Sequence, residues 1–400
     1  LFLSLLINLN LFSFNNFYLF NGAYKVDHLS NFMKVLIIVS GIFVMLSSSK
    51  YLKINKIFKI EYPILLLSSI LGMFIMISSN DLMVFYLGLE LQSLALYVLA
   101  SFKRNDQLSS ESGLKYFVLS ALSSGLLLYG CSLIYGFSGS TNFDQISNNI
   151  SEVQYGLTLG IVFILVGLAF KISAVPFHMW APDVYQGSPT SVTIFFAILP
   201  KIAALSVFIR FLYVPFINLI DQWQTIIIFV SIASMVFGAV AAIGQKNLKR
   251  LMAYSSISHM GFALAGLAVG TNEGIQSSLI YISIYLLMNL AFFSCLFMLK
   301  RNDIYHEDLS DLSGLSKNHP ILALCLLISL FSLAGIPPLA GFFAKFYIFL
   351  AVIKEEMYFL AIVGLLSTVV AAFYYLRVIK TIYFDSQTEK FDINHDIGLK

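Results

Sequence analysis

Charged residues are scarce in this 400-residue sequence: they make up 11% of it, whereas hydrophobic residues make up 58%. The mean hydropathy of +0.85 lies far outside the range of water-soluble globular domains, so a soluble enzyme is excluded. The 24 lysines and arginines against 21 acids give a net charge of only +3. Because this balance provides no basic surface of the kind that holds a phosphate backbone, nucleic-acid binding is excluded as well.

Cysteine is also scarce. Cys131, Cys295 and Cys325 lie far apart in apolar stretches and form no CxxC pair. Neither a disulfide framework nor a zinc or iron-sulfur site is therefore expected, and any redox cofactor belongs in a partner. The first 20 residues carry no charge and begin with Leu1, so they lack the basic region of a cleaved signal peptide.

What the sequence has in abundance is long uncharged runs. A bilayer core about 30 Å thick is crossed by about 20 apolar residues in a helix. This criterion predicts an all-α integral membrane protein with about twelve transmembrane helices in one membrane domain, because the gaps between runs are short and polar. The predicted spans are 1–20, 32–49, 62–79, 82–102, 112–137, 156–184, 190–214, 223–243, 250–270, 275–299, 320–350 and 357–383.

Successive loops alternate between many and few lysines and arginines, as expected if each predicted span carries the chain across the membrane. Loops on one side carry 14 of the 24 cations, whereas the other side has only Lys25, Lys34, Arg210 and Lys354. By the positive-inside rule the first side is cytoplasmic or faces the mitochondrial matrix. Four further lysines fall inside the apolar spans and need a separate explanation: Lys115, Lys171, Lys201 and Lys345.

Glu90 is the acid that lies deepest in a predicted span. It follows Asp81 by nine residues, which at helical rise places it roughly 14 Å into the membrane. An unpaired carboxylate there costs at least about 2.5 kcal/mol, so Glu90 is protonated, paired or hydrated. One interpretation is a structural hydrogen bond between helices, and the other is a carboxylate that takes up and releases protons.

Two of the buried lysines lie next to prolines. Lys171 is five residues before Pro176 in an apolar run that continues to Pro182, which predicts a helix broken within the membrane. Lys201 follows Pro200 about halfway along the next span. A lysine that reaches to the membrane surface is the alternative interpretation, but such lysines belong near helix ends. A buried ammonium can lose its proton near neutral pH, so both lysines are candidate proton carriers.

Three more groups complete the candidate site. Lys345 follows Gly335 and two prolines in a run too long for one straight crossing, which predicts a second broken helix. His259 lies about mid-span and is either a relay member or a satisfied helix contact. Lys115 lies three residues into its span and could equally be an interfacial anchor, so it is a second-tier candidate.

The predicted positions repeat along the chain. The broken helices are the sixth and eleventh spans, and Glu90 and His259 are on the fourth and ninth. Because an odd interval reverses direction, this spacing predicts two five-helix halves of inverted topology, as in many transporters. The predicted organisation is N-terminal helices over 1–60, a first half over 61–215, a second half over 223–384 and a polar tail over 385–400.

The sequence at these residues resembles the antiporter-like membrane subunits of respiratory complex I, the NADH-quinone oxidoreductase. The stretches LGLELQSLALYVL, GLAFKISAVPFHMWAPDVYQGSPT, NLKRLMAYSSISHMG and SLAGIPPLAGFFAKFY carry the resemblance. DVYQGSPT and Lys345 favour the subunit N group, called subunit 2 in mitochondria, over its sister subunits L and M. Bacterial members usually have fourteen helices, so the resemblance implies that the first and last lie outside this sequence.

The resemblance implies roles for the buried groups. Glu90 would pair with a lysine, Lys171 and Lys345 would be the lysines of the two broken helices, and Lys201 and His259 would connect them. NADH, FMN, iron-sulfur clusters and quinone would all belong to the rest of the complex, and no cofactor to this chain. Its partners would be the lipid bilayer and other complex I membrane subunits, in a bacterial inner membrane or alternatively a mitochondrial inner membrane.

Three hypotheses follow. The first is a proton-translocating subunit of NADH-quinone oxidoreductase, in which a Glu90–Lys171 ion pair controls neighbouring lysines and protons leave through Lys345. The second is an Mrp-type cation/proton antiporter, which DVYQGSPT disfavours. The third is a membrane scaffold whose buried charges only join helices, in which case neutralising Lys201 would damage assembly rather than turnover.

Overall fold

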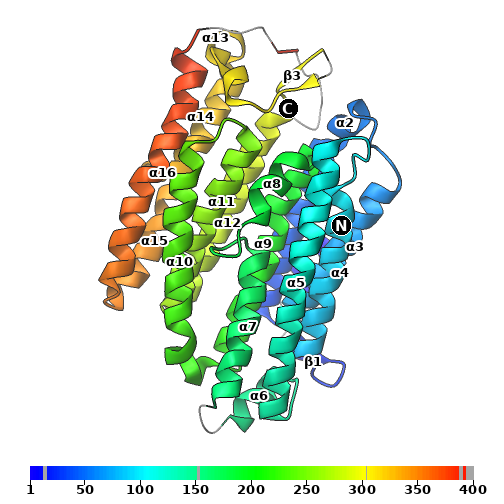
Figure 1. The fold of residues 1–400 in the computed structure, drawn as a ribbon, viewed down its shortest axis with the longest axis vertical. Helices are drawn as coiled ribbons and strands as arrows, with labels where there is room; N and C mark the ends of the chain where they lie inside the picture. The colour runs from blue at the N-terminus through cyan, green and yellow to red at the C-terminus, as the bar shows by residue number, and fades with distance from the viewer. Residues whose placement is uncertain (12–15, 151–153, 303, 387–390, 393–400) are drawn as a thin grey trace.

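Helices form almost all of the regular structure of the chain in the computed structural model, which describes residues 1–11, 16–150, 154–302, 304–386 and 391–392. They run between two opposite ends of an elongated bundle (Figure 1). The first nine are α1 (Phe2–Leu11), α2 (His28–Ile54), α3 (Glu61–Ile77), α4 (Leu82–Ala100), α5 (Gln107–Ser138), α6 (Phe143–Asn149), α7 (Tyr155–Lys171), α8 (Trp180–Gly187) and α9 (Thr190–Tyr213).

The second part of the chain adds seven more helices. They are α10 (Ile220–Ile243), α11 (Leu248–Ala268), α12 (Asn272–Leu296), α13 (Leu315–Asn318), α14 (Pro320–Ala334), α15 (Ala340–Lys354) and α16 (Tyr358–Phe384), with 3-10 turns η1 (Ile217–Leu219) and η2 (Leu309–Leu312). Two antiparallel hairpins lie at opposite ends of the bundle (Figure 1): β1 (Phe17–Leu19) with β2 (Tyr24–Val26), and β3 (Lys300–Arg301) with β4 (Ile304–Tyr305).

The predicted spans are largely confirmed. In the described part of the chain, eight helices are long and apolar enough to cross a membrane. α3 is shorter, with 17 residues. Both predicted broken helices are present: residues 172–179 separate α7 from α8, and residues 335–339 separate α14 from α15. The chain is therefore a multi-pass integral membrane protein.

The predicted span over 1–20 is wrong for residues 17–20, and residues 12–15 lie outside the described part of the chain. The described helix covers Phe2–Leu11, and Phe17–Leu19 pairs with Tyr24–Val26 as a strand. The link between the strands contains Asn21 and Gly22, both with positive φ, a pair of residues that strongly favours a hairpin turn. The hydropathy criterion counted only apolarity and ignored this turn signal. The predicted polar tail after residue 385 lies mostly outside the described residues.

Contacts between loops confirm that the cation-rich loops and the cation-poor loops lie at two different ends of one bundle. Tyr24 forms a bridge with Ser79, and Asp81 forms one with Asn142, all at the cation-poor end. Asn247 bridges Asp308 at the cation-rich end. The loops that the cation count assigned to one side therefore meet in space.

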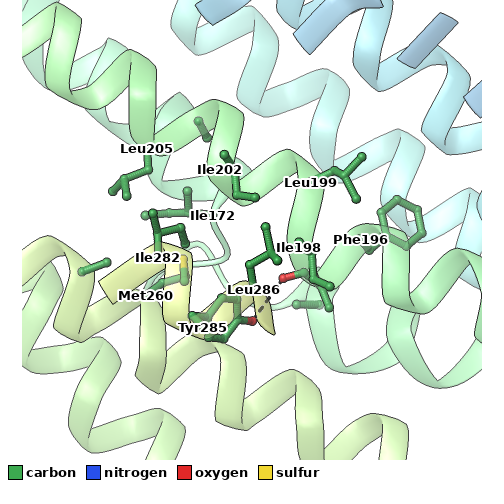
Figure 2. Packing of buried hydrophobic residues seen from close by; sticks show 14 of the residues in the cluster. Ile172, Phe196, Ile198, Leu199, Ile202, Leu205, Met260, Ile282, Tyr285 and Leu286 are labelled. Carbon is green, nitrogen blue, oxygen red and sulfur yellow. Dashed lines mark hydrogen bonds between the residues drawn. The ribbon is translucent and has the colours of Figure 1, made fainter. Parts of the chain in front are cut away.

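α9 lies at the centre of the bundle. Every residue from Thr190 to Leu212 is buried, and the helix contacts α2, α3, α7, α8, α11 and α12. Figure 2 shows Ile198 and Ile202 of this helix packed against Ile282 and Leu286 of α12. Such burial on all sides means that Lys201, on the same helix, cannot reach lipid or either end of the bundle.

Glycines establish how the two halves correspond. A Cβ on Gly72 of α3 would lie 2.5 Å from a backbone nitrogen of α4, and one on Gly238 of α10 would lie 2.6 Å from a backbone nitrogen of α11. Both helix pairs thus pack backbone to backbone, as small residues permit in membranes. The contacting positions Gly72 and Gly238, Gly88 and Tyr254, and Gln92 and Ser258 are each 166 residues apart.

This register refines the predicted repeat. α3 begins at the cation-rich end and α10 at the opposite end, so the two halves are inverted as predicted (Figure 1). A separation of 166 residues pairs Glu90 with Ser256 and Ser93 with His259. Glu90 and His259 are therefore on equivalent helices but one helical turn apart.

An ion pair fixes the cation-poor end of α9 to the start of α2. The Arg210 guanidinium is 2.9 Å from Oδ1 of Asp27, and the Arg210 side chain is only 2% exposed. Asp27 is also the N-cap of α2, where its side chain accepts from the Ser30 backbone N–H. Burial works to raise the pKa of the Asp27 carboxyl, but Arg210 and Ser30 outweigh it and lower that pKa below its usual 3.8.

We expect Asp27→Asn to lower the melting temperature of the detergent-solubilised protein, because it leaves the Arg210 charge buried without its partner, at a cost of about 3 kcal/mol. A lowered carboxyl pKa stabilises the fold above its unfolded value, and this contribution disappears as the pH falls through the folded value. The difference between wild type and variant should thus shrink below the usual pKa of 3.8. Asp221→Asn, at an exposed acid in α10, is the control, and equal effects of both substitutions at neutral pH would contradict the assignment.

Candidate functional site

Lys171 ends α7 at the first break and is 3% exposed. Its ammonium donates to the hydroxyl oxygens of Ser93 on α4 and Ser120 on α5, each at 2.7 Å. The Tyr97 hydroxyl donates to the same Ser120 oxygen at 2.7 Å. Hydroxyl groups both accept and donate, so Lys171 lies in a hydrogen-bonded chain that can hold it charged or neutral.

Glu90 is near this group but makes no ion pair with Lys171 in the described structure. It lies one helical turn before Ser93 on α4, and its Oε1 atom is buried without a hydrogen bond from any described residue. The predicted Glu90–Lys171 pair is therefore absent from this conformation, in which the ammonium donates to two serine hydroxyls. The buried Ser123 and Ser124 hydroxyls of α5 are also without a partner among the described residues.

Lys201 is completely buried and follows Pro200, which lies inside the continuous helix α9. Its ammonium donates to Ser256 of α11 at 2.5 Å and lies 5.7 Å from the ring centre of Tyr185 on α8. Pro200 has no N–H, so the Phe196 carbonyl four residues earlier loses its helical donor. The Tyr185 hydroxyl donates to that carbonyl at 3.2 Å, which ties α8 to the environment of Lys201.

His259 connects three helices of the second half. Its Nδ1 atom is 2.6 Å from the Tyr281 hydroxyl of α12, and its Nε2 atom is 3.1 Å from the Tyr375 hydroxyl of α16. Tyr375 in turn lies 2.5 Å from Ser255, the neighbour of the serine that holds Lys201. An imidazole bonded at both nitrogens can take a proton on one side and release one on the other.

Lys345 lies at the second break, on α15. Its ammonium donates to the Leu333 and Ala334 carbonyls at 3.3 and 2.9 Å, which are the last carbonyls of α14. The C-terminal end of a helix carries a partial negative charge, so this position stabilises a cation. Gly335 follows at φ +86°, and a Cβ there would lie 3.0 Å from the Lys345 side chain.

Lys115 is separate from this buried line. It is 39% exposed and pairs with Glu111 at 2.5 Å and Asp183 at 2.7 Å. Arg250 also pairs with Asp183, at 2.6 Å. Of the predicted groups, the structure thus buries Lys171, Lys201, His259 and Lys345 between helices, places Glu90 one turn from the first, and puts Lys115 in an ion cluster at the cation-rich end.

The residues that sequence reasoning missed are hydroxyls and one acid. Ser93, Ser120 and Ser256 hold the lysines, and Tyr281 and Tyr375 hold His259. Serine and tyrosine are common in membrane helices, so only the spacing of Ser93 three residues after Glu90 could have pointed to a role. Asp183 lies within the motif DVYQGSPT, and the search for charges in the middle of a span does not single it out.

Two inverted halves, each with a broken helix and a buried lysine at the break, define a membrane transporter of the inverted-repeat class, in which such groups mark an ion pathway. The family described as NADH:quinone oxidoreductase/Mrp antiporter, TM, matches residues 79–371. The chain belongs to this family.

Relatives place the chain within the family. It is 76% identical over 385 residues to NADH-quinone oxidoreductase subunit N of Pelagibacter ubique (strain HTCC1062), covering 96% of this chain and 82% of the relative. It is 53% identical over 374 residues to subunit N of Parvibaculum lavamentivorans, covering 93% of this chain and 77% of that one. The resemblance to the subunit N group is thereby confirmed.

Solved structures agree. A chain of respiratory complex I from Thermus thermophilus matches with a TM-score of 0.84 and 30% identity, covering 99% of this chain and 86% of that one. A chain of the Mrp complex from Dietzia sp. DQ12-45-1b matches with a TM-score of 0.82 and 24% identity, covering 91% and 68%. The second likeness extends to the fold alone.

Proposed function

We propose that this chain is the proton-translocating, antiporter-like subunit N of a bacterial NADH-quinone oxidoreductase, and that it moves protons along its buried lysines and histidine. The observation that carries the proposal is the hydrogen-bonded placement of Lys171, Lys201, His259 and Lys345 inside a chain 76% identical to such a subunit. The chain would act as part of a translocase in the inner membrane and hold no redox centre itself.

The geometry supports a relay with serine and tyrosine hydroxyls between the charged groups. Lys171 and Lys201 each face serine hydroxyls, which can turn to donate when the amine is neutral and accept when it is charged. The Ser255–Tyr375–His259–Tyr281 chain then leads across α11, α16 and α12. Protons would be taken up from the cation-rich side and leave through Lys345.

Charges between these buried helices influence one another. At a given separation, two charges interact far more strongly between buried helices than in water, so a proton on one lysine disfavours a proton on the next. Glu90 would supply the opposing negative charge near Lys171 when the pair closes. If protons occupied alternate lysines, a change in protonation at one end of the relay would then alter the protonation at the other end.

The working units are the two halves predicted from the sequence, over 61–215 and 223–384, with 1–60 as N-terminal helices. Equivalent backbone contacts 166 residues apart support this division. The partners would be the lipid bilayer and the other membrane subunits of the complex. Electrons would pass from NADH through FMN and iron-sulfur clusters to quinone in those other subunits.

The proposal is tested with Glu90→Gln and Lys171→Ala in the assembled complex. Both should lower proton translocation and coupled quinone reduction by about tenfold or more, since positioned acids and bases contribute at least that much to proton transfer. NADH oxidation by an artificial electron acceptor should stay at the wild-type level, because it needs only the redox subunits.

Lys354→Gln is the control, since it removes an exposed lysine that pairs with Glu273 at the surface. Full coupled activity in both site variants would overturn the proposal. Cation-dependent proton exchange by the isolated chain, without NADH activity, would instead favour an Mrp-type antiporter.

A further inference from the structure

α8 joins the two lysine sites of the first half. Its first residue, Trp180, donates through its indole N–H to the Phe170 carbonyl at 2.9 Å, next to Lys171. Five residues later, Tyr185 donates to the carbonyl that Pro200 leaves free, next to Lys201. Any shift of this eight-residue helix would therefore alter the surroundings of both lysines.

Asp183 lies between these two residues on α8. Its carboxylate accepts from Lys115 of α5 at 2.7 Å and from Arg250 of α11 at 2.6 Å. Arg250 also donates to Gln186 of α8 at 3.1 Å. One carboxylate thus fastens the short helix to a helix of the first half and to a helix of the second half.

The end of α8 has little room to move independently of these pairs. A Cβ on Gly187 would lie 2.3 Å from the Leu108 carbonyl oxygen of α5. Beside this contact is a cavity of about 200 Å³, lined by Glu111, Ser112, Gln186 and Arg250 among others. The ion pairs are partly exposed, since the side chains of Lys115, Asp183 and Arg250 are 39%, 33% and 31% exposed.

We infer that Asp183 is a positioning residue for proton transfer: by holding α8 between α5 and α11 it keeps Trp180 and Tyr185 in place beside Lys171 and Lys201. The inference rests on the proposed function. It also gives Lys115 a different part from the one predicted, as an anchor for α8 rather than a carrier of protons.

Asp183→Asn tests the inference because asparagine keeps the shape and removes the charge. We expect coupled quinone reduction and proton translocation to fall by about three- to tenfold. This is the size of effect expected when a small network of ion pairs that couples two sites is lost. The amount of assembled complex and NADH oxidation by an artificial acceptor should not change. Asp183→Glu, which can still reach both cations, should restore most of the coupled activity.

Glu111→Gln is the matched control. It removes an acid bound to the same Lys115, at 2.5 Å, but the pair lies within α5 and does not hold α8. Wild-type coupling is expected. If Asp183→Asn lowers the amount of complex, Arg250→Gln, which removes one of the two bridges, is measured in its place.

Wild-type coupling in Asp183→Asn, with coupling lost in Glu90→Gln and Lys171→Ala, would overturn this inference and leave the proposed function standing. An equal defect in Asp183→Glu and Asp183→Asn would also overturn it, since rescue by the second carboxylate would be absent. Wild-type coupling in all four variants would refute the proposed function itself.

Discussion

Lys201→Met is expected to lower NADH-driven proton translocation by at least about tenfold, because it removes a proton-carrying group from the middle of the relay. Methionine has a similar length and suits an apolar interior, so the change tests the charge more than the packing. Lys201 is completely buried and donates to Ser256, and no other lysine is on α9. The measurement is acidification of vesicles that contain the assembled complex.

The comparison that separates function from scaffolding is made on the same membranes. If the buried charges only join helices, Lys201→Met lowers the amount of complex, and the activity of each complex that remains is normal. If Lys201 carries protons, the amount is close to wild type and the turnover of each complex falls. Lys354→Met, at an exposed lysine, should change neither quantity.

Gly72→Ala is expected to destabilise the protein strongly. The added methyl group would lie 2.5 Å from the Gln92 nitrogen and 2.7 Å from the Gly88 carbonyl oxygen. These are backbone atoms, so α3 and α4 must separate, at a cost of about 1–3 kcal/mol or more. The amount of assembled complex and its melting temperature in detergent should both fall.

Gly125→Ala on α5 provides the control, because a methyl group there meets no atom within 4 Å. Removing a glycine from an exposed helix interior should leave the protein unchanged or stabilise it by up to about 1 kcal/mol. Gly238→Ala should repeat the defect of Gly72→Ala, since it occupies the equivalent place in the second half. Normal assembly of both of these variants would contradict the backbone-to-backbone register of the repeat.

Much of the fold could be predicted because membrane helices are selected by length and apolarity, which the sequence displays directly. The prolines near Lys171 and Lys345 likewise indicated both breaks. The hairpin at Phe17–Leu19 was missed because three apolar residues satisfy a hydropathy criterion whether they form a strand or a helix. Turn chemistry at Asn21 and Gly22 decided the outcome.

The sequence predicted how far along each helix the charged groups lie, but not which residues they contact. Charge placed mid-span identifies a group that needs a partner, yet it does not say which way the side chain points around the helix axis. Lys171 therefore turned out to contact Ser93 and Ser120 instead of Glu90. The register of the repeat could not be predicted from the sequence either. It depends on which glycines meet across helices rather than on sequence identity between the halves.

The most direct test of the central claim is to tag this chain, solubilise the membrane mildly and ask whether NADH-quinone reductase activity purifies with it in one large complex. The account predicts that it does, and that the purified complex acidifies vesicles when NADH and quinone are supplied. A chain that purifies alone or only with other antiporter-like subunits, and brings no NADH activity with it, would contradict the account.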